Sequence, residues 1–147
     1  MIDKLYQKTI LKHAAKATGH GAIEDADHSL IVHNPMCGDR IKVYIKINNG
    51  HLINFSHEAK ACALCQASAS VLGEHFQGLN KETLSTLIKT IKVSLDPSCS
   101  EETIFWPDEK WDDLNVFNVV REHKSRRTCV TLPFDALYQA MNEISNI

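Results

Sequence analysis

The most constraining feature of the sequence is a strict alternation of apolar and polar residues around a turn signal. Residues 41–47 (IKVYIKI) alternate as a strand with one buried face must, because successive side chains of a strand point to opposite faces. Residues 48–50 (NNG) follow, and Asn and Gly tolerate the positive φ of a tight hairpin turn. Residues 52–57 are the expected partner strand, and residues 30–32 a further short one. These segments predict a small three-stranded antiparallel sheet.

Outside the hairpin the apolar residues recur every three or four positions, the period of a helix with one buried face. One such helix precedes the sheet and three follow it. Their expected inward residues are Ile2, Leu5, Tyr6, Ile10 and Ala14; Cys62, Cys65, Ala69, Leu72 and Phe76; Leu84, Leu87, Ile88 and Ile91; and Phe134, Leu137, Met141 and Ile144. Thr131 as a cap and Pro133 in the first turn place the start of the last helix just after Cys129.

Strands followed by helices predict an α+β fold, with the helices packed on one face of the sheet. The chain has 147 residues, a length that fits one domain spanning residues 1–147. Residues 94–125 lack a clear period, but Trp106, Trp111 and Phe117 indicate a packed insert.

Charge and hydropathy narrow the class of protein. The net charge is −2 and no block of like charges occurs, which argues against nucleic acid or an anionic membrane as the main partner. No apolar run approaches about 18 residues, and the N-terminal segment is amphipathic without a signal-peptide core. We therefore expect a soluble, cytoplasmic protein.

Five cysteines are the unusual part of the composition. The number is odd, and the cytosol keeps thiols reduced, so a disulfide framework is not expected. Metal binding or thiol chemistry is the better interpretation.

Three of these cysteines and one aspartate form a candidate site. Cys37 and Asp39 flank Gly38 in a turn between two predicted strands, and the glycine allows both side chains to point at one spot. Cys62 lies where a strand passes into a helix, and Cys129 precedes the last predicted helix. Thiolates suit zinc and iron–sulfur chemistry, whereas a carboxylate is a harder ligand, so this set predicts a metal or cluster site that can open.

Two of the thiols have surroundings that favour the thiolate. The helix N-terminus should stabilise the Cys62 thiolate, and the cations Arg126 and Arg127 should lower the pKa of Cys129.

Less specific interpretations apply to the remaining residues. Cys65 and Cys99 fit small core residues, and Asp39 alone fits a turn residue. Cys62 and Cys65 also have the spacing of a redox pair or of half a zinc knuckle, but no second such pair occurs. The eight histidines show no metal-binding pattern, and nearly all are expected at the surface.

Three segments resemble the iron–sulfur cluster assembly family that comprises NifU N-terminal domains, IscU and SufU. Residues 34–41 (NPMCGDRI), 61–70 (ACALCQASAS) and 126–137 (RRTCVTLPFDAL) are similar to that family's three ligand motifs, in the same order.

The resemblance is closer to the SufU branch than to IscU. Thr128 precedes Cys129 where IscU proteins carry histidine, no proline-pair chaperone motif occurs, and the segment between the second and third motifs is long. Ala61 and Cys65 stand where the family typically has glycine and serine.

The resemblance implies the family's α+β sandwich and a Zn²⁺ ion held by Cys37, Asp39, Cys62 and Cys129. It further implies a pyridoxal-phosphate-dependent, SufS-like cysteine desulfurase as the sulfur donor, with Cys37 as the candidate acceptor. This function is zinc-dependent sulfur relay to downstream assembly or recipient proteins, a sulfurtransferase activity. The alternatives are a non-enzymatic scaffold that assembles a [2Fe–2S] cluster on the same four residues, and a purely structural zinc domain.

Overall fold

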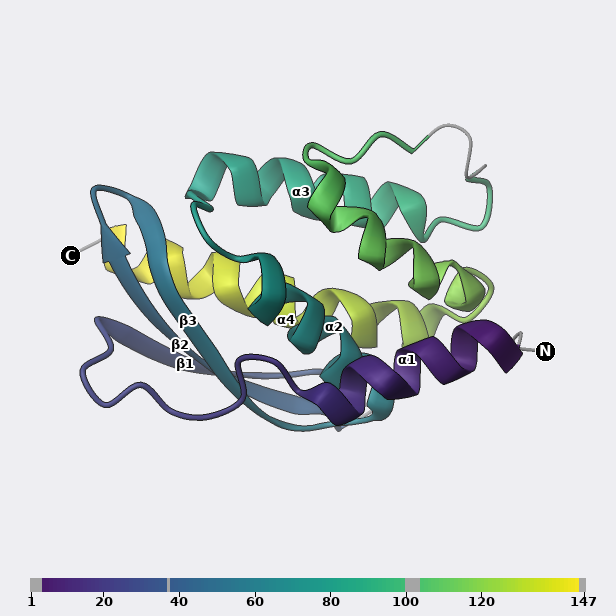
Figure 1. Ribbon diagram of the computed structural model, residues 1–147, viewed down its shortest axis with the longest axis horizontal. Helices are drawn as coiled ribbons and strands as arrows, with labels where there is room; N and C mark the ends of the chain where they lie inside the picture. Colours follow the sequence, from purple (N-terminus) through teal and green to yellow (C-terminus); the bar gives the residue numbers. More distant parts are fainter. Residues whose placement is uncertain (1–3, 37, 100–103, 146–147) are drawn as a thin grey trace.

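The sheet and the helices form separate layers (Figure 1). The computed structural model describes residues 4–36, 38–99 and 104–145. The elements are β1 (His28–His33), β2 (Arg40–Asn48), β3 (His51–Lys60), α1 (Lys4–Lys16), α2 (Ala63–His75), α3 (Lys81–Ser94), a 3₁₀ helix η2 (Glu109–Val120) and α4 (Lys124–Ser145). The strands pair antiparallel in the order β1-β2-β3. The predicted α+β fold with a three-stranded antiparallel sheet is confirmed.

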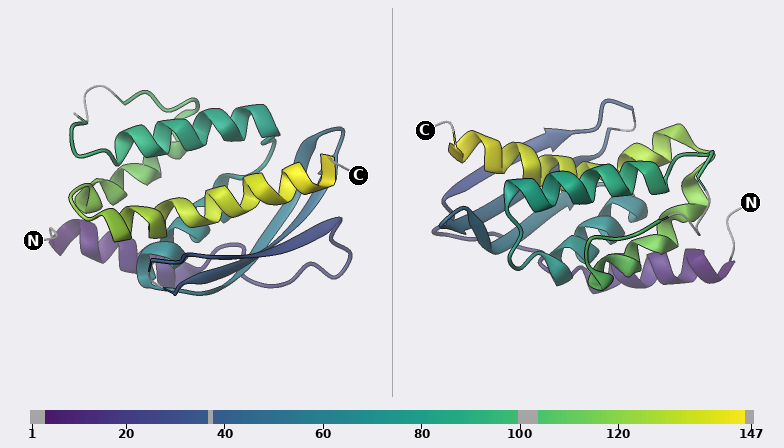
Figure 2. Two further views of the ribbon diagram at one scale, coloured as in Figure 1. Left: turned by 180° about the vertical axis from the view of Figure 1, so that it is seen from behind. Right: turned by 90° about the horizontal axis from the view of Figure 1, so that it is seen from above.

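The helices cover one face of the sheet and leave the other uncovered (Figure 2). Helix α4 packs on β1 and β2, and α2 packs on β3. Helix α1 lies against α2, whereas α3 lies against α4 farther from the sheet. None of these helices, over the residues described, is long and apolar enough to cross a membrane.

The β2–β3 hairpin follows the predicted alternation. Asn49 and Gly50 have φ of +54° and +78°, the left-handed conformation that a two-residue turn requires at both positions. Val43 and Ile45 are buried against the helices, and Lys42 lies on the uncovered face. The alternation therefore determines which face of the sheet meets the core.

The predicted insert contains the long 3₁₀ helix η2, and the buried side chains of this helix recur every third residue. They are Trp111, Leu114, Phe117 and Val120. A 3₁₀ helix has three residues per turn, so this spacing places all four on one face, toward the core. Trp106, half-buried, donates its indole N–H to the Asn115 side chain at 3.0 Å. Trp111 and Phe117 thus lie in the core as expected, and Trp106 packs against it.

The predicted start of the last helix is wrong. Helix α4 begins at Lys124, so Cys129 lies inside it and Pro133 interrupts its interior. A proline removes one helical hydrogen bond and disturbs the preceding turn. The Ser68 hydroxyl of α2 donates to the Val130 carbonyl at 2.5 Å, within that turn. This tertiary contact helps the helix to continue through the proline.

A short junction ties the chain after α1 to β3 and α2. The His57 N–H donates to the Gly19 carbonyl at 3.0 Å, and the Gly21 N–H donates to the His57 carbonyl at 2.9 Å. The His57 ring is buried and donates from Nε2 to the Thr18 carbonyl at 2.9 Å. His57 is therefore an exception to the expectation that the histidines lie at the surface.

The close packing of α2 on this junction predicts the effect of one added methyl group. A Cβ on Gly73 would lie 2.2 Å from the Thr18 carbonyl oxygen. We expect Gly73→Ala to lower the free energy of unfolding by about 2 kcal/mol, since the overlap outweighs the better helix propensity of alanine. Urea denaturation measures the change, with Thr86→Ala at an exposed position of α3 as the control. Equal stability of Gly73→Ala and the wild type would contradict this packing.

Burial of His57 predicts a pH dependence of stability. Burial lowers the pKa of His57, the neighbouring His20 lowers it further, and the bond to Thr18 opposes the shift. Above about pH 6.5 the ring is neutral in the folded and the unfolded chain, and the free energy of unfolding has its full value. As the pH falls through this value, the unfolded chain takes up a proton that the folded chain does not, so the free energy of unfolding decreases.

We expect His57→Gln, which can still donate to the Thr18 carbonyl, to lose less stability than the wild type between about pH 7 and pH 5.5. Denaturant unfolding at both pH values measures the difference, and His51→Gln at an exposed position is the control. Parallel losses in His57→Gln and the wild type would assign the pH dependence to other groups.

Candidate metal centre

Three of the four predicted site residues come together at one end of the sheet. The ligand atoms of Asp39, Cys62 and Cys129 all lie within 4.8 Å of one another. They come from the turn before β2, the residue before α2 and the second turn of α4. Cys37, the fourth predicted ligand, lies outside the described residues.

Asp39 is the residue whose surroundings point most directly to a cation. Its side chain is only 7% exposed, and its Oδ1 accepts the Cys62 N–H at 3.1 Å. Its Oδ2 is buried and has no hydrogen-bond partner among the described residues. The desolvation penalty for leaving a buried acceptor without a hydrogen bond is on the order of 1–3 kcal/mol, and it is larger for a charged group. A metal ion bound beside the two sulfurs would satisfy this oxygen, so the donor set fits zinc or an iron–sulfur cluster.

The turn that carries Asp39 is fastened to α4 by Asn34, a residue whose role the sequence did not reveal. The Asn34 N–H donates to the Asp39 carbonyl at 2.7 Å, and the Gly38 N–H donates to the Asn34 carbonyl at 3.0 Å. The Asn34 side chain is buried and donates to the Thr128 hydroxyl at 3.0 Å, with the Cys129 sulfur 4.0 Å away. Asn34 therefore positions one candidate ligand relative to another. The sequence signal at this position, asparagine before proline, indicated only a turn.

Gly38 has the conformation that the sequence required of it. Its φ is +73°, in the left-handed region that glycine adopts without strain. This conformation bends the chain directly before Asp39, whereas the predicted convergence of the Cys37 side chain lies outside the described residues.

Cys62 occupies the N-cap of α2, as predicted, but its ionisation differs from the expectation. Burial raises the pKa of Cys62, and the neighbouring Asp39 carboxylate raises it further. Hydrogen bonds from the Cys65 backbone and the Cys129 side chain lower the pKa but do not reverse the shift. The residue is exposed as a whole, but its thiol faces these groups and is partly desolvated. The predicted stabilisation of the Cys62 thiolate is thus wrong for the metal-free site, whereas a bound cation favours deprotonation of a coordinated thiol.

Cys129 lines a cavity of about 420 Å³. Its side chain is 4% exposed, and its thiol donates to the Ser125 carbonyl at 3.4 Å. The residues that line the cavity are Asp39, Cys62, Ala63, Leu64, Ser125, Arg126 and Cys129. The three candidate ligands therefore line one cavity, and Arg126 adds a positive charge to its lining. Cys65 lies in the hydrophobic core, in agreement with its interpretation as a core residue.

A second group of side chains with metal-binding chemistry already has partners within the protein. Glu74, His75 and Asp113 bring three ligand atoms within 4.8 Å of one another. Lys16 forms an ion pair with Glu74 at 2.6 Å, and His75 contacts Asp113 at 2.8 Å. These pairs account for the group as a link between α1, α2 and η2.

Residues 5–103 match the family described as NifU-like N terminal domain, and the chain belongs to this family. The zinc-dependent sulfurtransferase SufU of Bacillus subtilis (strain 168) is 26% identical over 92% of this chain and 88% of its own length. The iron–sulfur cluster assembly scaffold protein IscU of Thermotoga maritima is 27% identical over 96% of this chain and 95% of its own. The crystal structure of a nitrogen-fixing NifU-like protein (N-terminal) from Brucella abortus has a TM-score of 0.85 and 32% identity, with 99% of this chain and 97% of that chain covered. The family predicted from the three motifs is confirmed.

The unpartnered oxygen of Asp39 predicts opposite effects of one substitution with and without metal. Asp39→Asn keeps an acceptor for the Cys62 N–H but removes the buried charge. We expect the metal-free variant to be at least as stable as the wild type, and its stabilisation by zinc to be smaller. A 100-fold weaker affinity would remove about 2.7 kcal/mol of that stabilisation at saturating zinc.

Thermal unfolding with and without excess zinc measures both effects. The control is Asp135→Asn on α4. It removes a partly exposed carboxylate that pairs with Lys92 of α3 at 3.4 Å. Full zinc stabilisation of Asp39→Asn would exclude the carboxylate as a ligand.

Proposed function

We propose that this protein acts in iron–sulfur cluster assembly as a zinc-dependent sulfur acceptor, supplied by a pyridoxal-phosphate-dependent, SufS-like cysteine desulfurase. The observation that carries the proposal is the buried Oδ2 of Asp39, which has no partner among the described residues and lies beside Cys62 and Cys129. Membership in the NifU-like family and the similarity to the zinc-dependent sulfurtransferase of Bacillus subtilis support it.

The proposed zinc ligands are Cys37, Asp39, Cys62 and Cys129. Bound zinc would keep the ligating thiols deprotonated at neutral pH. Asp39 is a harder donor than the thiols, and as a ligand it would help to hold the ion if one thiol detached. Cys37 is the proposed leaving thiol because the sequence predicts it in a turn, whereas Cys62 is the N-cap of α2 and Cys129 lies within α4, and these two helices pack on each other.

Sulfur transfer then needs no redox partner. The Cys37 thiolate attacks the outer sulfur of the desulfurase persulfide, a new S–S bond forms to Cys37, and the S–S bond of the desulfurase breaks. The electron pair of the broken bond remains on the desulfurase cysteine as a thiolate. Downstream assembly or recipient proteins consume the persulfide.

The second candidate function is a scaffold on which a [2Fe–2S] cluster assembles on the same four residues and is passed on. The similarity to the Thermotoga maritima scaffold protein favours it, as does a donor set that consists mainly of thiols. Metal and acid-labile sulfide per chain, measured in anaerobically purified protein, separate the candidates. Zinc near one per chain without sulfide supports sulfur relay, and iron with matching sulfide supports the scaffold.

The sulfur-relay proposal predicts the effect of removing the acceptor thiol. We expect Cys37→Ala to abolish the stimulation of desulfurase turnover while the fold persists, because the persulfide can no longer be discharged. Alanine production by the desulfurase is the measurement, and circular dichroism checks the fold.

The control is Cys99→Ser, which removes a half-buried thiol that does not line the cavity. Undiminished stimulation by Cys37→Ala would reject Cys37 as the acceptor. A purely structural zinc domain would instead show lower stability on loss of any ligand and no effect of the wild type on the desulfurase.

A further inference from the structure

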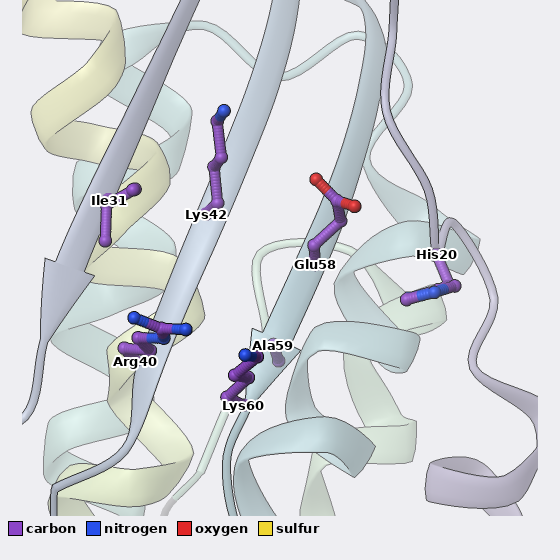
Figure 3. A pocket seen from close by; sticks show the side chains of 7 residues that line it. All are labelled: His20, Ile31, Arg40, Lys42, Glu58, Ala59 and Lys60. Atoms are coloured by element: carbon purple, nitrogen blue, oxygen red, sulfur yellow. The ribbon is translucent and has the colours of Figure 1, made fainter.

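The uncovered face of the sheet carries a basic cavity of about 380 Å³ (Figure 3). Its lining residues are His20, Ile31, Arg40, Lys42, Glu58, Ala59 and Lys60. The charged side chains of the lining, apart from the histidine, sum to +2, whereas the whole chain carries −2. Positive charge is therefore concentrated on this face of an otherwise acidic protein.

Two of the cations oppose each other without compensation. Arg40 of β2 is the direct cross-strand partner of Lys60 of β3, and both side chains are exposed. Like charges directly opposite in a sheet destabilise it. No carboxylate of the described residues lies within ion-pair distance of either side chain. Figure 3 shows the two side chains at the same end of their strands.

The third cation differs, because it has an acidic neighbour. Lys42 is the cross-strand partner of Glu58, and its ammonium group lies 4.9 Å from the centre of the Tyr44 ring. The Tyr44 hydroxyl in turn donates to the Glu58 carboxylate. Glu58 is thus engaged with Tyr44, Lys42 lies over the Tyr44 ring, and the charges of Arg40 and Lys60 remain available to a partner.

The uncompensated pair borders the candidate metal centre. Arg40 directly follows Asp39, and Lys60 precedes Cys62 by two residues. Ile31, which is 51% exposed, adds an apolar contact within the cavity. A protein that reaches the metal centre at this end of the sheet also meets the basic pair. An exposed apolar side chain beside charged ones is a combination that protein–protein interfaces use.

We propose that Arg40 and Lys60, with Ile31 on the neighbouring edge strand β1, form the docking surface for an acidic patch of the cysteine desulfurase. The inference rests on the proposed function and adds the surface that guides the desulfurase to the site. The long, exposed side chains lie on an open sheet face, which suits carboxylates presented by a protein surface better than an enclosed small anion. Charge pairs of this kind mainly raise the association rate and fix the orientation of the partner.

The test compares two charge reversals of equal size. Arg40→Glu/Lys60→Glu reverses the pair, and Lys81→Glu/Lys89→Glu makes the same change in net charge on α3, in the helical layer. Affinity for the desulfurase is measured by biolayer interferometry from about 50 to 300 mM salt, since screening grows over this range. Zinc content per chain shows whether the metal centre remains intact, and Lys60→Glu alone leaves the residue next to Asp39 unchanged.

We expect the Arg40/Lys60 reversal to weaken binding at least tenfold at low salt and to flatten the salt dependence, with zinc content unchanged. Lys60→Glu should show a smaller loss, and the α3 control should bind as the wild type does. Equal affinity and equal salt dependence of both double variants would overturn the docking surface while desulfurase stimulation, and with it the proposed function, still stands. A wild type that neither binds nor stimulates the desulfurase would overturn both.

Discussion

The hydrogen bond from the Cys62 N–H to the Asp39 carboxylate is the contact on which the candidate centre depends. At 3.1 Å it joins the turn before β2 to the start of α2, 23 residues later in the chain. Asn34 extends the link to α4 through the Thr128 hydroxyl. One oxygen of Asp39 is engaged in this way, and the other has no partner among the described residues although the carboxylate lies beside two sulfurs.

Without a metal ion, the buried carboxylate of Asp39 has two unfavourable effects. Burial of Asp39 is unfavourable without a cation, and the same carboxylate raises the pKa of Cys62. A metal ion relieves both, since it pairs with the carboxylate and favours the coordinated thiolate. If zinc binds as proposed, the stability of the fold and the occupancy of the site are coupled, as in other proteins whose metal ligands come from separate elements.

The layered fold separates the core from the surfaces that a partner can reach. Helices α2 and α4 cover the inner face of the sheet and also carry or adjoin Cys62 and Cys129. No helix covers the outer face, and its charged residues are free of the packing that governs the inner face (Figure 2). The two faces meet at the strand ends, where Arg40 and Lys60 stand beside the site residues. A partner that approaches this end contacts charge and site together.

The sequence by itself determined the three strands, the apolar stripes of the helices and the grouping of three candidate site residues. The alternation in β2 and β3 and the apolar stripes of the helices were readable because neighbouring residues encode a local period. Three motifs far apart in the chain identified Asp39, Cys62 and Cys129 as one group, although not the geometry that joins them.

Only the tertiary structure decided the remaining features, since they depend on contacts between distant residues. Helix α4 continues through Pro133 with support from Ser68, which lies 62 residues from Val130. Asn34 acts on the site through Thr128, 94 residues away. The unpaired oxygen of Asp39 and the unpaired charges of Arg40 and Lys60 likewise depend on which groups the fold brings near them. A local pattern contains no information about such absences or about long-range hydrogen bonds, because both are set by how the layers pack.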